Sequence, residues 1–332
     1  MIRSVSRRDF LTGGILGATA LCASANGAGM FDEDNANSLT GGESCSLDLD
    51  KIRFCLNLGS LRHYNLNLMQ ELEVARDAGF HSVEIWFDRL TDYARDDGSQ
   101  GFSTKKLQEL KRFIDGEGLK IEGGIGFAPW IVDDNNRRAS GLNEIKIQAE
   151  ALSFLDSHCI AAPASGIDQR ISDHAKIADR YREIIDICRP FGVRPLLELW
   201  GASSTLGKLS DCLAVCAETG REDAALLLDV YHLYRGGNSF AALALISGSA
   251  LPILHMNDYP AAIEREKLTD ADRVFPGDGD APWATIIQIL AKNGFTGALS
   301  YEVFNRSYFE KYSAVEQAQI SLEKMRRVLN WK

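Results

Sequence analysis

The sequence has no surplus of basic residues and few histidines, and both shortages limit what the protein can bind. Its 332 residues include 36 Lys and Arg, 46 Asp and Glu and six His, which gives a formal net charge of −10 at pH 7. Because a nucleic-acid partner requires a basic face that meets the phosphates, this charge argues against DNA or RNA binding. We expect a small-molecule partner and no nucleic acid.

Paired cysteines and a glycine-rich phosphate loop are also missing. The seven cysteines contain no Cys-x-x-Cys pair, and we expect buried thiols rather than disulfides. No Gly-x-Gly-x-x-Gly turn follows the first predicted strand, where Asn57-Leu58-Gly59-Ser60 stands, and this argues against a dinucleotide-binding doubly wound sheet. With only eight prolines and 45% hydrophobic residues, the chain after residue 50 has no linker and predicts one large domain.

The N-terminus has the pattern of an export signal. Ser6-Arg7-Arg8-Asp9-Phe10-Leu11 is a twin-arginine motif, and it is followed by a mildly apolar stretch and the small residues Ala23-Ser24-Ala25. We predict a twin-arginine signal peptide over residues 1–25 and export by the twin-arginine machinery to the periplasm or elsewhere outside the cytoplasm. Residues 26–50 are polar without an apolar period and predict a disordered linker, so the folded domain is expected over 51–332.

Past residue 50, short apolar runs alternate eight times with segments of helical period. Eight strand-helix units predict an α/β fold of the closed (β/α)8 TIM barrel type, with an open doubly wound sheet as the alternative. Helices are expected to begin near Asn65, Ser103, Gly141, Ser172, Ser204, Ser239, Ala281 and Ser307. The predicted strands cover 52–58, 82–87, 119–125, 159–165, 193–199, 224–229, 251–257 and 297–303.

Four residues able to bind one divalent metal lie at or near the ends of the last four strands. They are Glu198, Asp229, His255 and Glu302. An ionised carboxylate loses several kcal/mol on leaving water unless a cation or hydrogen bonds compensate it. Since catalytic groups of such barrels project from the C-terminal strand ends, we predict that the four side chains converge on one metal ion. Taken singly, Asp229 could instead cap a helix and His255 could be a core histidine.

The same residues, together with Asp229-Val-Tyr-His232, His255-Met-Asn-Asp258 and Pro276-Gly277-Asp278-Gly279, resemble the xylose isomerase-like TIM barrels. This group includes sugar isomerases, ketose 3-epimerases, hydroxypyruvate isomerase and inosose dehydratase. The resemblance implies that the four residues bind Mn²⁺, Mg²⁺, Co²⁺ or Zn²⁺, among which the donor types do not choose. It further implies that Glu198 and Glu302 carry protons between carbons of a carbohydrate substrate through an enediolate.

Further residues near the predicted catalytic end are candidates for substrate binding. His232 lies one helical turn beyond Asp229, and the long segment after His255 offers Arg265 or Arg273 to reach substrate hydroxyls. Asp258 could orient a ligand or be an exposed loop carboxylate. Aromatic rings cover the C–H faces of sugars, so Trp86 and Trp130 could bind substrate or pack in the core. Glu84, an acid within an apolar strand, also requires a partner.

The predicted function is a metal-dependent isomerase or epimerase of a sugar or polyol ketone. Two alternatives remain open, a hydro-lyase that resembles inosose dehydratase and a non-catalytic carbohydrate-binding barrel, because fold alone does not determine function. An endonuclease on the same barrel is disfavoured by the acidity and the few histidines. Leu199-Trp200 after Glu198 and the lack of a basic cluster favour a free sugar, polyol or keto-acid over a sugar phosphate. Self-association into a homo-oligomer is left open.

Overall fold

The computed structural model describes residues 47–95 and 101–330. The predicted export signal and most of the predicted linker lie outside these residues. Residues 47–50, which we assigned to the linker, are described: Leu47 is buried, and Leu49–Lys51 forms a 3-10 turn just before the first strand. No helix of the described ranges combines the length and the apolar character needed to cross a bilayer.

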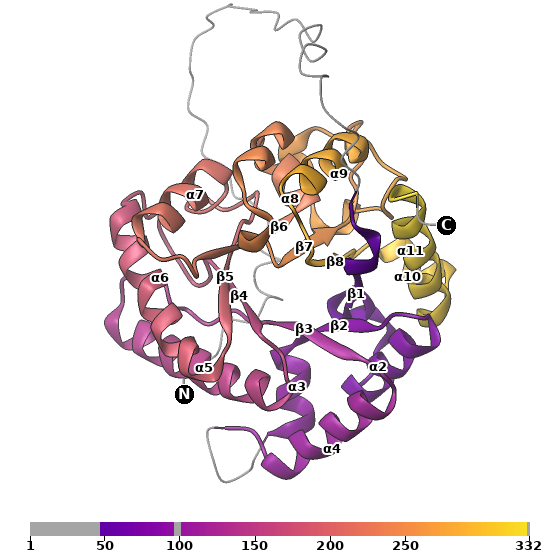
Figure 1. Ribbon diagram of the computed structural model, residues 1–332, viewed down its shortest axis with the longest axis horizontal. Helices are drawn as coiled ribbons and strands as arrows, with labels where there is room; N and C mark the ends of the chain where they lie inside the picture. Colours follow the sequence, from indigo (N-terminus) through magenta and orange to yellow (C-terminus); the bar gives the residue numbers. More distant parts are fainter. Residues whose placement is uncertain (1–46, 96–100, 331–332) are drawn as a thin grey trace, which may run out of the picture. The chain divides into compact units, whose positions relative to one another are not determined.

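Eight parallel strands close into one barrel in the order of the sequence, with β1 paired to both β2 and β8. Figure 1 shows the barrel at the centre of a ring of helices. The predicted fold class is therefore confirmed, and each strand lies within about two residues of its predicted range. The strands are β1 Arg53–Asn57, β2 Ser82–Trp86, β3 Lys120–Ile125, β4 Cys159–Pro163, β5 Arg194–Glu198, β6 Ala225–Asp229, β7 Ile253–Met256 and β8 Ala298–Tyr301.

The helices begin where side-chain caps and apolar periods allow. They are α2 Leu68–Asp77, α3 Phe87–Ala94, α4 Thr104–Gly116, α5 Asn135–Phe154, α6 His174–Cys188, α7 Leu209–Glu218, α8 Val230–Arg235, α9 Trp283–Lys292, α10 Arg306–Lys311 and α11 Ala314–Val328. Three predictions were wrong. Helix α7 begins at Leu209, five residues after Ser204. Helix α5 begins six residues before Gly141, because Asp134 caps it by accepting from the backbone N–H of Arg137. The unit after β6 has the short helix α8 and a 3-10 segment instead of a helix from Ser239.

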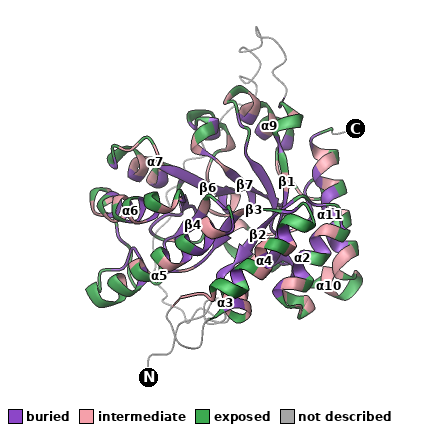
Figure 2. Ribbon diagram, turned by 60° about the horizontal axis from the view of Figure 1, so that its bottom comes forward, coloured by how far each residue is buried: buried purple, intermediate pink, exposed green. Residues whose placement is uncertain are grey.

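The core has two layers. The larger layer packs the outer faces of the strands against the inner faces of the helices, and Figure 2 shows these faces as buried while the outer helix faces are exposed. The smaller layer fills the barrel with the small side chains of Cys55, Ala161, Ala225 and Ala298 and with six larger ones, Trp86, Ile125, Leu196, Leu227, Ile253 and Phe304. Because side chains alternate along a strand, every second residue enters the barrel, and the polar ones gather near its C-terminal end.

Candidate metal centre

Strand register brings the predicted ligands to one end of the barrel. Asp229 is paired with His255 across β6 and β7, and His255 is paired with Ser300 across β7 and β8. Glu302 lies two residues beyond Ser300 and therefore points to the same side of the sheet. All four side chains are buried. The apolar runs that form these strands thus place three polar groups side by side within the barrel.

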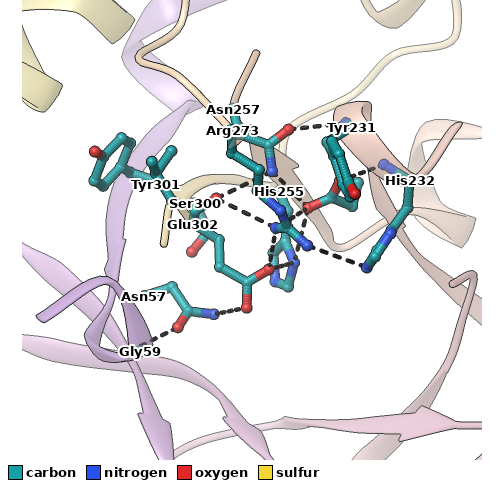
Figure 3. Close-up of polar contacts among 12 residues, drawn as sticks. Asn57, Gly59, Tyr231, His232, His255, Asn257, Arg273, Ser300, Tyr301 and Glu302 are labelled. Atoms are coloured by element: carbon teal, nitrogen blue, oxygen red, sulfur yellow. Dashed lines mark hydrogen bonds and ion pairs between the residues drawn. The ribbon is translucent and has the colours of Figure 1, made fainter. Parts of the chain in front are cut away.

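Asp229, His255 and Glu302 form a compact donor set. One ligand atom from each lies within 4.8 Å of the other two. The His255 Nδ1 atom is 3.3 Å from Glu302 Oε2 and 3.7 Å from Asp229 Oδ2. Figure 3 shows the His255 and Glu302 side chains facing one another. Two carboxylates and an imidazole nitrogen around one point are the donors that zinc, manganese and cobalt accept.

Asp229 both caps a helix and faces this donor set. Its Oδ1 accepts from the backbone N–H of His232 at 2.7 Å, which caps α8, while its Oδ2 accepts from Asn257 Nδ2 at 2.6 Å. The two interpretations of Asp229 considered from the sequence are therefore compatible. Glu198, the fourth predicted ligand, is buried at the end of β5 but does not belong to the compact set of three.

A buried arginine from the loop after β7, Arg273, forms ion pairs with carboxylates of the centre. Arg273 Nη1 donates to Asp229 Oδ2 at 3.0 Å and to Glu302 Oε2 at 2.8 Å, and Nη2 donates to Asp270 Oδ1 at 2.6 Å. The guanidinium also lies over the Tyr231 ring, 4.6 Å from its centroid. Although burial lowers the pKa of Arg273, the three carboxylates raise it well above its ordinary value. Arg273 therefore stays charged.

His232 offers an unused hydrogen-bond donor. Its Nε2 lies 3.2 Å from Arg273 Nη2. Since a guanidinium only donates, this nitrogen accepts and the imidazole proton is on Nδ1. Burial lowers the pKa of His232 to about 4, so the ring is neutral at neutral pH. Nδ1 is buried and has no hydrogen-bond partner among the residues that the structure describes, which suits it to donate to a bound oxygen.

Glu84 lies behind His255 rather than at a surface that a substrate could reach. Its Oε2 accepts from His255 Nε2 at 3.1 Å, from Asn57 Nδ2 at 3.3 Å and from the Ser300 hydroxyl. Only 1% of Glu84 is exposed, and this oxygen already has three donors. The structure thus places Glu84, which we predicted to bind substrate, in a supporting position beneath a candidate ligand.

Three further residues that we predicted to bind substrate lie in different surroundings. Trp130 packs in the layer between strands and helices, where its Nε1 donates to the Pro163 carbonyl at 2.8 Å. Asp258 is buried, not exposed, and accepts from three backbone N–H groups and from Trp283 Nε1, so it holds the loop after β7 together. Arg265 is partly exposed over the Tyr234 ring, and Arg273 instead enters the centre.

Trp86 does lie at the catalytic end of the barrel. Its ring contacts Phe127 and Phe304 at centroid distances of 5.5 and 6.2 Å, and its Nε1 donates to Asn57 Oδ1 at 2.6 Å. Together with Trp200, whose ring centroid is 5.8 Å from that of Phe127, these rings form an aromatic group contributed by loops and strand ends on several sides of the barrel. A substrate contact by Trp86 remains a prediction.

Sequence reasoning missed Asn57 and Asn257 and did not choose between Arg265 and Arg273. Asn257 binds Asp229, the Tyr231 backbone N–H and the Glu302 carbonyl, and it lies within the His255-Met-Asn-Asp segment. Asn57 ends the apolar run of β1, so the argument applied to the acids at strand ends would have identified it. No sequence signal distinguishes Arg273 from Arg265, because only the path of the loop decides which of the two side chains reaches the metal centre.

The charges of this centre favour a bound cation. Four buried carboxylates, Glu84, Glu198, Asp229 and Glu302, lie at this end of the barrel, whereas Arg273 is the only buried Arg or Lys among the described residues. Burial of the His255 ring lowers its pKa, but the Glu84 and Glu302 carboxylates raise it well above its ordinary value. Unbalanced buried charge is costly. The donor set and this excess of negative charge both fit a divalent ion.

Fold and site together define a (β/α)8 barrel with a candidate divalent-metal centre at the C-terminal end of its strands. The chain belongs to the xylose isomerase-like TIM barrel family, whose family model matches residues 72–328.

The chain is similar to several characterised proteins. It is 28% identical to an inosose isomerase of Halalkalibacterium halodurans over 276 residues, which cover 78% of this chain and 90% of that protein. It is 21% identical to the D-psicose 3-epimerase of Agrobacterium fabrum over 246 residues, or 70% and 78% of the two chains. The crystal structure of the IOLI protein with a bound zinc atom has a TM-score of 0.72 and 24% identity, covering 84% and 98% of the two chains. This likeness supports the same fold.

Proposed function

We propose that the protein is a divalent-metal-dependent isomerase or epimerase that moves a proton next to the carbonyl group of a polyol ketone or sugar. The observation that carries the proposal is the compact donor set of Asp229, His255 and Glu302 at the C-terminal end of the barrel. Similar proteins act as an inosose isomerase and a D-psicose 3-epimerase, and a protein of the same fold binds zinc. All three support a metal-assisted reaction on a keto-polyol.

Asp229, His255 and Glu302 would hold the ion, with Glu198 as the fourth ligand from β5. A bound divalent ion supplies a Lewis acid that polarises a substrate carbonyl and stabilises the negative charge formed when the neighbouring carbon loses its proton. Its identity among Mn²⁺, Mg²⁺, Co²⁺ and Zn²⁺ is for elemental analysis to decide.

The protein's own side chains would move the proton. Glu302 would remove a proton from the substrate carbon, and a protonated Glu198 would donate its own proton, to the same carbon for an epimer or to the neighbouring carbon for an isomer. In the isomer the neighbouring hydroxyl proton also moves to the former carbonyl oxygen, and both glutamates then exchange protons with solvent. Arg273 would hold the Glu302 carboxylate in place, since its Nη1 donates to Oε2 at 2.8 Å. His232 donates from Nδ1 to a substrate oxygen, since that nitrogen has no partner within the described residues. The aromatic rings around Trp86 would cover the C–H face of the substrate.

The test combines elemental analysis with proton exchange. The purified protein should contain about one divalent ion, and it should incorporate deuterium from D₂O into inosose or a ketohexose at the carbon next to the carbonyl. Chelator should stop this exchange, and re-addition of the ion should restore it. Glu302→Gln should prevent exchange even in the metal-loaded protein. A protein that binds sugar equally with and without chelator, and exchanges no proton, would be a carbohydrate-binding barrel and not an enzyme.

A hydro-lyase is the second candidate, because the same proton removal can be followed by loss of water from a cyclic polyol ketone. The same experiment separates the two. A dehydrated, ultraviolet-absorbing product indicates the hydro-lyase, whereas deuterated substrate and its isomer without loss of water indicate the isomerase.

We also propose that residues 1–25 direct export by the twin-arginine route. The support is the Arg7-Arg8 pair with its apolar stretch. Cell fractionation should find the mature protein outside the cytoplasm, and replacing both arginines with lysine should leave it inside.

A further inference from the structure

One carboxylate beneath the metal centre, that of Glu84, contacts the candidate ligand His255 directly and the candidate base Glu302 through Asn57. Glu84 points into the barrel from β2, two residues before the strand ends at Trp86, so it lies one layer below the strand-end groups. Its Oε2 accepts from His255 Nε2, Asn57 Nδ2 and the Ser300 hydroxyl. Each of these four residues is at most 1% exposed.

The contact with Glu84 determines which nitrogen of His255 faces the ion. Glu84 Oε2 already accepts from the Asn57 amide and the Ser300 hydroxyl, so we assign Nε2 of His255 as a third donor to it. A bound ion would then meet the other nitrogen, Nδ1, which lies 3.7 Å from Asp229 Oδ2 and 3.3 Å from Glu302 Oε2. A carboxylate behind a metal-binding histidine also makes the imidazole a stronger ligand.

Asn57 connects Glu84 to Glu302, the proposed base. Its Nδ2 donates both to Glu84 Oε2 at 3.3 Å and to Glu302 Oε1 at 3.2 Å. Its Oδ1 accepts from Trp86 Nε1 at 2.6 Å and from the Gly59 backbone N–H at 2.9 Å. Because two donors face Oδ1 and two carboxylate oxygens face Nδ2, turning the amide over would break all four hydrogen bonds, and only one orientation satisfies them. Figure 3 shows the Asn57 side chain directed at Glu302.

We propose that Glu84 is a positioning residue that sets the metal affinity of the centre. It holds His255 with Nδ1 toward the ion and, through Asn57, holds Glu302 in place, while itself touching neither ion nor substrate. The proposal rests on the proposed metal-dependent function. A purely structural role for Glu84 would predict an effect on folding but none on metal affinity at constant fold.

The decisive variant is Glu84→Gln, which keeps an acceptor oxygen of the same reach and removes the negative charge. Zn²⁺ affinity is measured by competition with a chromogenic chelator, and the fold is checked by the melting temperature in excess EDTA. We expect binding weakened by about 10–100-fold, with the metal-free melting temperature no lower than that of the wild type. A Kd within twofold of wild type in a folded variant would overturn the proposal.

Glu122→Gln is the matched control. Glu122 is also a glutamate of a barrel strand, β3, but its Oε1 pairs with Arg53 Nε at 2.7 Å instead of contacting the metal centre. We expect its Zn²⁺ affinity to equal that of the wild type. An equal loss in both variants would show that only the total negative charge of the barrel matters, and the proposal would then be wrong.

A measurement on the wild type keeps the proposal testable if Glu84→Gln does not fold. Only six histidines need assigning, so imidazole ¹⁵N spectra of the Zn²⁺-loaded protein can identify His255 by comparison with His255→Asn. We expect Nδ1 bound to zinc and a slowly exchanging proton on Nε2, whereas zinc on Nε2 would refute the proposal. If the wild type binds no divalent ion at all, the proposed function itself is wrong.

Discussion

Replacing Arg273 with Gln tests how the centre balances its charge. The guanidinium is fully buried and contacts Asp229, Glu302 and Asp270. Removing one partner of a buried ion pair leaves an uncompensated charge that costs about 3–5 kcal/mol. At roughly 2–4 °C per kcal/mol for a domain of somewhat smaller size, the melting temperature in EDTA should decrease by about 6–20 °C.

The same substitution should strengthen ion binding. Arg273 Nη1 uses the two oxygens, Asp229 Oδ2 and Glu302 Oε2, that lie nearest to the free nitrogen of His255. Without this competing cation, the variant should bind Zn²⁺ or Mn²⁺ at least about tenfold more tightly, and each tenfold is worth roughly 1.4 kcal/mol. Saturating ion should therefore raise the melting temperature of Arg273→Gln by more than it raises that of the wild type.

Differential scanning calorimetry with and without ion, together with chelator competition, measures both effects. Arg265→Gln is the control from the same loop, since Arg265 is partly exposed and contacts the Tyr234 ring, and its removal should cost less than about 1 kcal/mol. The reasoning fails if Arg273→Gln is as stable as the wild type in EDTA, or if it binds the ion no more tightly.

Three further predictions follow from single side chains. His255→Asn should lose the bound ion on dialysis, as measured by elemental analysis, because it removes the nitrogen at the centre of the donor set. Glu302→Gln at saturating metal should slow deuterium exchange by about 10²–10⁴-fold, and an unchanged exchange rate would exclude Glu302 as the base. Burial raises the pKa of Glu71 to about 7, although Arg89 lowers it in part, whereas the unfolded pKa is near 4.5. The native state therefore keeps a proton that the unfolded state loses, and the free energy of unfolding should decrease by on the order of 3 kcal/mol as the pH rises from about 4.5 to 7. Urea unfolding at several pH values measures this decrease, which Glu71→Gln should flatten. Equal pH profiles of wild type and variant would contradict the assignment.

The fold could be predicted because barrel strands are short, buried runs with a regular spacing. Each run of β-branched and aliphatic residues is bounded by polar or glycine-containing turns, and this fixed all eight strands to within about two residues. Helix starts were harder to place. The first turn of α5, Asn135 to Arg138, is polar and has no apolar period, so only the Asp134 cap marks it. Helices α3 and α8 follow their strands without a turn residue between, which is why they were missed.

The site was predictable where a residue lies on a strand and unpredictable where it lies on a loop. Asp229, His255 and Glu302 were found because strand ends of a closed barrel meet at one place. Arg273 and Asp258 depend on how the loop after β7 folds back, and the periodicity of the sequence contains no information on that path. Asp258 seemed available to a ligand, yet four N–H groups of its own loop occupy it.

Counting residues along a strand would have corrected the prediction for Glu84. Since side chains on one face recur every two residues and each residue advances about 3.3 Å, a residue two positions before the strand end lies roughly 6.6 Å deeper in the barrel. Glu84 stands in this relation to Trp86, and Ser300 stands in it to Glu302. The two deeper residues contact each other through the Ser300 hydroxyl and Glu84 Oε2, whereas the candidate ligand Glu302 and the aromatic Trp86 belong to the layer above. Depth along its own strand therefore distinguishes the candidate ligand Glu302 from Ser300, but it does not act alone, because His255 is paired with Ser300 and is itself a candidate ligand.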